Sequence, residues 1–204
     1  MINTGKIKVI LLVIFFLCFS HSLEAQLQWR SHSTKNEPNN LGIDLNYQIP
    51  QGFDRNSGTV FPYVLSEFDR ITYNTSGDIE TITYFTVATI PMLDVSGLLK
   101  TTNGAWIPEM VELFLDDFAK QLNGIRSYEI LWFGGYPTLD VKLWQEQILP
   151  YVVFRDIDAR IILLETKFIK LECGDVSTQV NKLEHSKNFQ SLCVPFFNNI
   201  SFKY

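Results

Sequence analysis

Apolar and polar side chains alternate strictly in the segment IDLNYQI, residues 43–49. A period of two places successive side chains on opposite faces of an extended chain, so this segment predicts a strand with one buried face. The strand is expected to end at Pro50, where the sequence PQGF indicates a turn. Two further segments, 63–73 and 79–90, are rich in Val, Ile, Thr, Tyr and Phe. They predict a pair of antiparallel strands joined by the turn residues 74–78.

The second half of the chain returns to strand-like segments after residue 129. Four strands are predicted there, over residues 130–133, 138–144, 158–165 and 167–173. Gly134, Gly135 and Pro137 indicate a turn between the first two. The stretch QEQILPYVVFRDI at 145–157 is apolar without a clear period, so it could be an irregular loop or a further edge strand.

A helix is predicted between these two groups of strands. Pro108 suits the first helical position, Glu109 suits the first turn, and Gly124 supplies a stop. Charged residues would point to water on the opposite face from an apolar stripe. That stripe consists of Ile107, Met110, Val111, Phe114, Phe118 and Leu122, and the charged residues are Glu109, Glu112, Asp116, Asp117 and Lys120.

A second amphipathic helix is predicted in NFQSLCVPFFNNISF, residues 188–202. Its apolar residues recur at helical spacing, and we expect Phe189, Leu192, Phe196 and Phe197 to be buried against the sheet. Pro195 interrupts the segment, and a proline inside a helix costs about 3 kcal/mol. It therefore predicts a kink or a restart near that position.

The order of these elements indicates an α+β fold. A strand, a hairpin, a helix, several strands and a final helix predict a single antiparallel sheet on which a central amphipathic helix and a C-terminal helix are packed. The chain contains no repeat and no linker long enough to divide it. We therefore expect one domain at residues 41–204, preceded by a polar lead-in at residues 26–40.

The first 25 residues have the order of a secretory signal peptide. Lys6 and Lys8 precede an apolar block at 9–19, which is too short for a bilayer span of about 20 residues, and small residues follow. Cleavage after Ala25 is preferred and cleavage after Ser22 is the alternative. An uncleaved membrane anchor would be the other interpretation. With cleavage, the protein is predicted to be secreted or periplasmic, with no stable membrane insertion.

Charge narrows the range of partners. The full chain has a formal net charge of −5, and removal of residues 1–25 takes away two Lys and one Glu, which moves it to −6. An acidic exported protein is a poor candidate for binding nucleic acid or anionic membrane surfaces.

Two cysteines, Cys173 and Cys193, remain after cleavage. In an oxidising compartment they predict a disulfide, provided that their Cα atoms lie within about 7 Å of each other. The alternative is two inert buried thiols.

Residues that usually carry catalysis are scarce. Only His32 and His185 remain after cleavage, neither has metal-ligand spacing, and the chain lacks the GxSxG, SxxK and glycine-rich phosphate-binding motifs. The pair Asp156 and Asp158 is interpreted as a turn at a strand end, and the sequence DRNSG at 54–58 is interpreted as another turn. No catalytic residue, metal ligand or cofactor is predicted.

Aromatic residues make up 14% of the chain. Four of them, Tyr136, Trp144, Tyr151 and Phe154, lie close together in sequence around the irregular segment. They are a candidate groove for a peptide or another apolar ligand, and ordinary core packing is the alternative.

Several short motifs resemble the PsbP-like, DcrB-like superfamily. They are a strand ending in PQGF at 50–53, the central amphipathic helix, the sequence GYP at 135–137, and the closing FFNNISF at 196–202. The resemblance extends over most of residues 40–204. It implies an antiparallel sheet flanked by helices, usually without catalytic residues.

Relatives in that superfamily include an extrinsic photosystem subunit, a Ran-binding import factor, periplasmic lipoproteins and secretion chaperones. Together with the predicted signal peptide and the missing catalytic motifs, the resemblance favours an exported, non-enzymatic binding or assembly protein whose partner is a protein or a small apolar ligand. A hydrolase or metal-dependent enzyme with an unrecognised site is one alternative. A structural protein of the cell envelope is another.

Overall fold

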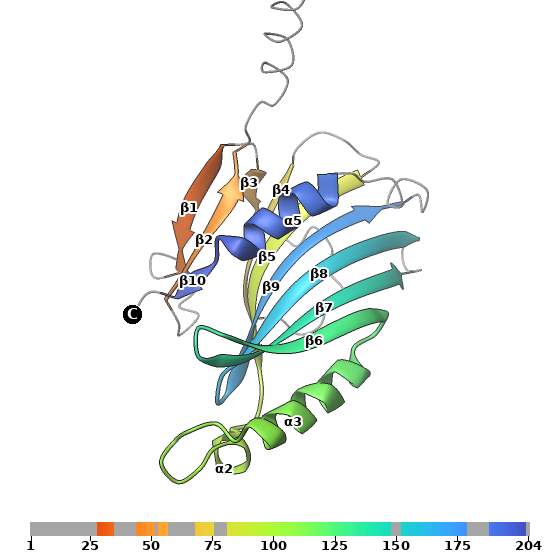
Figure 1. The fold of residues 1–204 in the computed structure, drawn as a ribbon. Helices are drawn as coiled ribbons and strands as arrows, with labels where there is room; N and C mark the ends of the chain where they lie inside the picture. The colour runs from red at the N-terminus through yellow and green to blue at the C-terminus, as the bar shows by residue number, and fades with distance from the viewer. Residues whose placement is uncertain are drawn as a thin grey trace, which may run out of the picture.

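The computed structural model describes residues 28–34, 44–51, 53–56, 68–75, 81–147, 152–178 and 188–202. The predicted signal peptide lies outside these residues. Within them, strands form two antiparallel sheets (Figure 1). The two longer helices pack on opposite faces of the larger sheet. The α+β class is thus confirmed.

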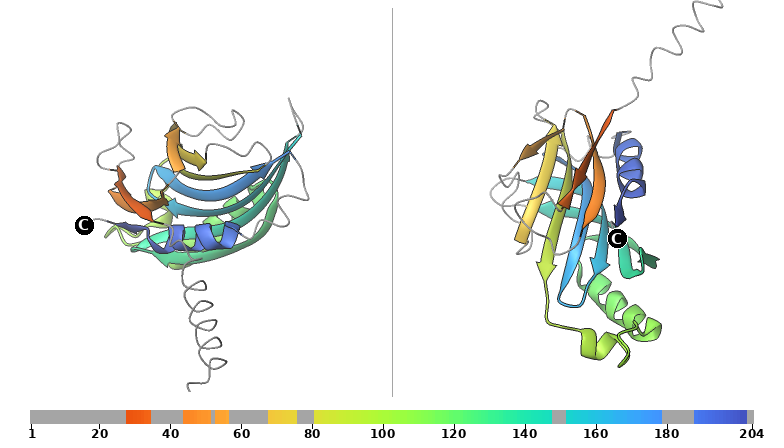
Figure 2. Two further views of the ribbon diagram at one scale, coloured as in Figure 1. Left: turned by 90° about the horizontal axis from the view of Figure 1, so that it is seen from above. Right: turned by 90° about the vertical axis from the view of Figure 1, so that its left-hand side faces the viewer.

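The larger sheet has seven strands in the order β3-β4-β5-β9-β8-β7-β6, and it is strongly curved (Figure 2). The strands are β3 (Phe53–Asn56), β4 (Phe68–Thr75), β5 (Thr81–Pro91), β6 (Ile125–Phe133), β7 (Tyr136–Gln147), β8 (Val153–Leu163) and β9 (Lys167–Ser177). The predicted hairpin of β4 and β5 is confirmed, as is the turn at Gly134 and Gly135 between β6 and β7. The segment 145–157, which has no clear period in the sequence, contains the end of β7 and the beginning of β8.

The smaller sheet has the order β1-β2-β10, so the prediction of a single sheet is wrong. The alternating segment is β2 (Leu45–Pro50), and its apolar residues Leu45, Tyr47 and Ile49 are buried as expected. Its neighbours are β10 (Ser201–Phe202) and β1 (Trp29–Ser33). Strand β1 lies in the segment predicted to be a polar lead-in, because pairing along β2 and stacking of His32 on Tyr47 stabilise a sequence with little apolar content of its own.

Helix α3 (Pro108–Gln121) covers one face of the seven-stranded sheet and confirms the predicted central helix. Pro108 begins it, and Glu109 lies in its first turn. Its most buried residues are Val111, Leu115 and Ala119, spaced four apart. Only Val111 belongs to the predicted apolar stripe, so the buried face is rotated toward Leu115 and Ala119. A short helix, α2 (Ser96–Leu99), precedes it and buries Leu99 in the same core.

Helix α5 (Asn188–Asn198) packs on the opposite face and confirms the predicted C-terminal helix. Leu192 and Phe196 are buried and Phe197 is half-buried, whereas the side chain of Phe189 lies outside the described residues. The helix does not restart at Pro195. One helix runs through that residue and ends where the backbone N–H of Asn199 donates to the carbonyl of Pro195 at 3.0 Å.

The two faces of the sheet therefore bury separate cores. One core joins α5, β2 and the inner positions of β5 and β9, and the other lies beneath α3 over β7, β8 and β9. Among the residues that the structure describes, no helix is long and apolar enough to cross a membrane.

Candidate functional site

A cavity of about 440 Å³ lies between the C-terminal end of α3 and the sheet. Apolar side chains supply much of its lining, and several polar and charged side chains complete it. The lining residues are Ile90, Gln121, Leu122, Asn123, Leu143, Gln145, Glu146, Arg155, Ile157, Ala159, Ile161, Lys170 and Glu172. A volume of this size is within the usual range for small-molecule sites.

The cavity exists because α3 ends before it covers the full width of the sheet. The chain turns away at Gly124, whose backbone has φ +77° and lies so close to β7 that an added Cβ would meet the carbonyl oxygen of Trp144 at 1.9 Å. Glycine is the residue that accepts both the positive φ and the close approach of the Trp144 carbonyl oxygen. The backbone N–H of Trp144 donates to the carbonyl of Gly124 at 2.7 Å, which fixes Leu122 and Asn123 as one wall of the cavity.

Three charged side chains line this cavity on the face of β8 and β9 that otherwise carries apolar residues. Arg155 follows the two-residue period of Ile157 and Ala159 along β8, and Glu172 lies opposite Ala159 on β9. Lys170 lies opposite Ile161 in the same way. The side chains of all three charged residues are almost fully buried, with 5%, 7% and 2% exposed for Arg155, Lys170 and Glu172. We call these three residues and Tyr84 the polar floor.

Hydrogen bonds connect the four side chains of the polar floor. Arg155 Nη2 donates to Glu172 Oε1 at 2.8 Å and to the hydroxyl oxygen of Tyr84 at 2.5 Å. The Tyr84 hydroxyl in turn donates to Glu172 Oε1. Lys170 Nζ lies 2.5 Å from Glu172 Oε2, so both carboxylate oxygens bind a cation. Such a connected network holds its side chains in one arrangement, because each polar group would be costly to leave unsatisfied in the interior.

The polar floor is charged at neutral pH. Burial by itself would raise the pKa of Glu172, but the positive charges of Lys170 and Arg155 outweigh it and lower that pKa to about 2. Burial raises the pKa of Tyr84 well above its ordinary value, so its hydroxyl stays protonated. The floor thus places a carboxylate and two cationic side chains beside an apolar wall.

The structure brings two residues of the predicted aromatic groove together and places a third elsewhere. Trp144 and Phe154 lie on adjacent strands with ring centroids 6.4 Å apart, whereas Tyr136 begins β7 and packs against Phe202. Tyr151 lies outside the described residues. Trp144 and Phe154 are on the α5 side of the sheet, since they alternate with Gln145 and Arg155 on the cavity side.

The acidic pair Asp156 and Asp158 lies in the interior of β8, so the predicted turn at this point is wrong. Both point to the α5 side of the sheet, and Asp156 is opposite Asp175 on β9. Burial raises the pKa of both residues of the pair, and neighbouring carboxylates contribute to the rise. Among the described residues, no group of His, Cys, Asp and Glu side chains could hold a metal ion.

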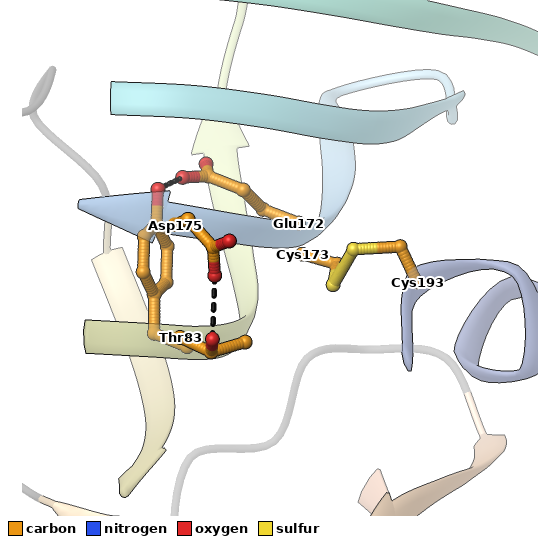
Figure 3. Close-up of a disulfide and its surroundings, with 6 residues drawn as sticks. Thr83, Glu172, Cys173, Asp175 and Cys193 are labelled. Atoms are coloured by element: carbon orange, nitrogen blue, oxygen red, sulfur yellow. Dashed lines mark hydrogen bonds between the residues drawn. A yellow bond between two sulfur atoms is a disulfide. The ribbon is translucent and has the colours of Figure 1, made fainter. Parts of the chain in front are cut away.

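The predicted disulfide between Cys173 and Cys193 is confirmed, with Cα atoms 5.5 Å apart. It joins β9 to α5 within the core on the α5 side. Figure 3 shows that Cys173 points toward the helix while its neighbour Glu172 points to the other side of β9. Strand β9 therefore carries both the covalent link of one core and two residues of the polar floor on the other face, Lys170 and Glu172.

Sequence reasoning missed the polar floor. The signal for it is present in FIKLEC at 168–173, where Lys170 and Glu172 share one face of a segment whose other face is apolar. Of the two histidines considered in the sequence, His32 stacks on Tyr47 with ring centroids 5.5 Å apart. His185 lies outside the described residues.

No protein-family model and no curated protein matches the sequence. Several solved structures are similar in fold. LpqN of Mycobacterium tuberculosis, involved in cell envelope biogenesis, matches with 8% identity over 87% of this chain and 92% of its own, at a TM-score of 0.43. The Ran-binding protein Mog1p of Saccharomyces cerevisiae matches with 14% identity over 87% of this chain and 96% of its own, at a TM-score of 0.43.

A third structure, the cyanobacterial PsbP of Synechocystis sp. PCC 6803, matches with 12% identity over 89% of this chain and 96% of its own, at a TM-score of 0.44. These three proteins share the PsbP/Mog1/DcrB-like fold, the same superfamily that the sequence motifs resemble. At these identities the likeness concerns the course of the chain and not its chemistry.

Proposed function

We propose that this protein is an exported, non-enzymatic binding protein whose ligand is a small molecule with an apolar body and one hydrogen-bond-accepting end. The cavity beside α3 is the binding site. The observation that carries the proposal is the combination of an apolar wall with a buried polar floor in a space of about 440 Å³. Sites for small molecules typically combine apolar walls with a few fixed polar groups.

The chemistry of the polar floor favours an acceptor over a donor at the polar end. Arg155 and Lys170 carry only N–H donors, and Glu172 is already bonded to both of them and to Tyr84. A ligand carboxylate would meet donors of opposite charge, whereas a ligand ammonium would meet like charge. The apolar end would lie along Leu143, Ile157 and Ile161.

The cysteines and the N-terminal sequence support the proposal that the protein is exported. A disulfide such as Cys173–Cys193 persists in oxidising surroundings, and the N-terminal sequence has the order of a signal peptide. We therefore place the protein outside the cytoplasm.

Hydrolysis finds less support at this site. Among the described residues that line the cavity, none is a Ser, Cys or His. The carboxylate of Glu172 has a low pKa and bonds to two cations, which makes it a poor general base.

The test uses three ligands that share one chain and differ at the polar end: decanoate, decanol and decylamine. Binding to the oxidised protein is measured by calorimetry, and the contacted residues are identified from amide shifts in nuclear magnetic resonance spectra. We expect decanoate to bind tightest and decylamine weakest, with the largest shifts at 121–124 and 155–161. Equal affinity for all three, or shifts elsewhere, would contradict the proposal.

Two variants locate the site. Leu122→Trp puts a larger side chain at the wall and is expected to abolish decanoate binding. Leu93→Trp is its matched control, because Leu93 is exposed and does not line the cavity. Lys170→Met removes one donor of the floor and should reduce the preference for decanoate over decanol.

A further inference from the structure

Strand β6 forms an end of the seven-stranded sheet. It pairs with β7 on one side, and among the described residues no strand lies on its other side. A bulge interrupts the ladder between Ile125 and Ser127, after which the pairing is regular up to Phe133. An edge strand offers unpaired backbone donors and acceptors to another extended segment.

Apolar side chains are exposed next to this edge. Tyr128, Ile130 and Trp132 are every second residue of β6, so they lie on one face of the strand. Leu113 projects from the neighbouring face of α3. The exposed fractions are 39% for Tyr128, 49% for Trp132 and 65% for Leu113. Trp and Tyr are enriched among residues that dominate binding energy at protein interfaces.

Acidic side chains border the same surface. Glu109, Glu112 and Asp116 of α3 line an open groove together with Leu113, Tyr128 and Ile130. Asp116 bonds to Lys120 and to the Tyr128 hydroxyl. Among the residues that the structure describes, neither Glu109 nor Glu112 forms an ion pair. We call these six residues and Trp132 the edge groove.

We propose that the edge groove docks an extended segment of a partner protein in which Lys or Arg residues alternate with apolar ones. The segment would add a strand along residues 128–133 of β6. Successive side chains of an extended segment point to opposite faces. Its Lys or Arg side chains would therefore lie along Tyr128, Ile130 and Trp132 and reach the carboxylates of α3, and its apolar side chains would lie beside Leu131 and Phe133 on the other face.

Charge also decides against a second copy of this chain as the occupant. Two β6 strands paired edge to edge would bring two sets of the same carboxylates to one interface, which opposes association through like-charge repulsion. The binding site also differs from the cavity, since their linings have no residue in common.

The experiment uses synthetic peptides with blocked ends. One alternates lysine and valine, a second of equal length alternates glutamate and valine, and a third is the lysine peptide with N-methyl groups on alternate backbone amides. Binding to the full oxidised protein is followed by amide shifts and by calorimetry at low and physiological salt. We expect the lysine peptide to shift amides 128–133 and to bind at least tenfold tighter than the other two.

Variants test the carboxylates and the aromatic contact separately. Glu109→Gln combined with Glu112→Gln should weaken the lysine peptide several-fold and reduce its salt dependence, and Trp132→Ala should weaken it at either salt concentration. Asp117→Asn is the matched control, because this exposed acid of α3 does not line the groove. Equal binding of the lysine and glutamate peptides, shifts outside β6, or no effect of Trp132→Ala would each overturn the proposal.

Discussion

The ring of Tyr84 lies directly over the backbone of Gly174 on the neighbouring strand. A Cβ at position 174 would come within 2.6 Å of the Tyr84 hydroxyl oxygen and within 2.7 Å of the ring carbon that bears it. The missing side chain at Gly174 is what lets Tyr84 cross β9 to reach Glu172 and Arg155. The polar floor therefore depends on a glycine within a long strand.

Replacing this glycine is expected to destabilise the protein. In Gly174→Ala the new methyl group collides with a phenol that is 4% exposed and held by two hydrogen bonds. Overpacking of this kind costs about 1–3 kcal/mol, which exceeds the usual gain of about 0.4–1 kcal/mol from a stiffer unfolded chain. Urea denaturation gives the difference in the free energy of unfolding.

Gly97→Ala is the matched control for that variant, because nothing lies within 4 Å of a Cβ at this helical position. It should leave stability unchanged or raise it. A second comparison places Gly174→Ala in a Tyr84→Leu background, where most of its cost should disappear. Full additivity of the two changes would show that the collision is not the cause.

Loss of the disulfide is expected to lower the free energy of unfolding by about 3 kcal/mol, the usual value for a loop closed across a sequence separation of 20. The double variant Cys173→Ala with Cys193→Ala should melt at a lower temperature than the oxidised protein. Amides of α5 should exchange faster with solvent, since this bond ties the helix to β9. Reduction of the unaltered protein should reproduce the effect, and an unchanged melting temperature would refute it.

The low pKa of Glu172 predicts how stability depends on pH. Since this pKa is about 2 in the folded protein and 4.5 as the reference value, the folded state gains stability above pH 4.5 and loses it as the pH falls toward 2. The shift corresponds to about 3 kcal/mol. The free energy of unfolding, measured by urea titration between pH 2 and 7, should therefore decline steeply below pH 4.5.

Glu172→Gln should remove that part of the acid slope, although it also lowers stability at neutral pH. Glu165→Gln serves as the control, because Glu165 pairs with Lys100 on the surface and its side chain is 53% exposed. Its pH profile should run parallel to that of the unaltered protein. If the slope below pH 4.5 were the same in Glu172→Gln, another group would be responsible for it.

Arg160 connects three elements, and its replacement by lysine should be costly. Its Nε and Nη2 each bind one oxygen of Asp140 at 2.8 Å, and its guanidinium stacks 4.6 Å from the centre of the Phe133 ring. Lysine provides neither the paired bonds nor the flat stacking surface, so Arg160→Lys should lose about 1–2 kcal/mol. By contrast, Lys120→Ala breaks an exposed pair and should leave the free energy of unfolding almost unchanged in the same denaturation assay.

The sequence was most informative where one periodic pattern determined one element. Leu45, Tyr47 and Ile49 alternate because a single face of β2 is buried, and the stripe of α3 is visible because that helix lies on a sheet. Strand β1 has no such pattern, since it depends on the backbone ladder with β2. A strand stabilised by its neighbour cannot be recognised from its own residues.

The cavity could not be predicted for a different reason. The charged residues Lys170 and Glu172 were visible in the sequence, but their burial depends on where α3 ends relative to β8 and β9. That relation is set by Gly124 and its contact with Trp144, which are distant from both charges in sequence. The aromatic residues, in turn, were close in sequence but diverge because β7 carries Tyr136 and Trp144 to different regions of the sheet.

The pairing of Ser201 with Asn46 in the small sheet bears on the order in which the molecule assembles. During synthesis, β2 emerges long before β10, so the side of β2 that pairs with β10 has no strand partner until residues 51–200 have been made. Contacts between such distant residues form slowly, because a long loop must close first. The small sheet is therefore expected to be the last part of the fold to be completed, and the helix that leads into β10 brings the closing strand to it.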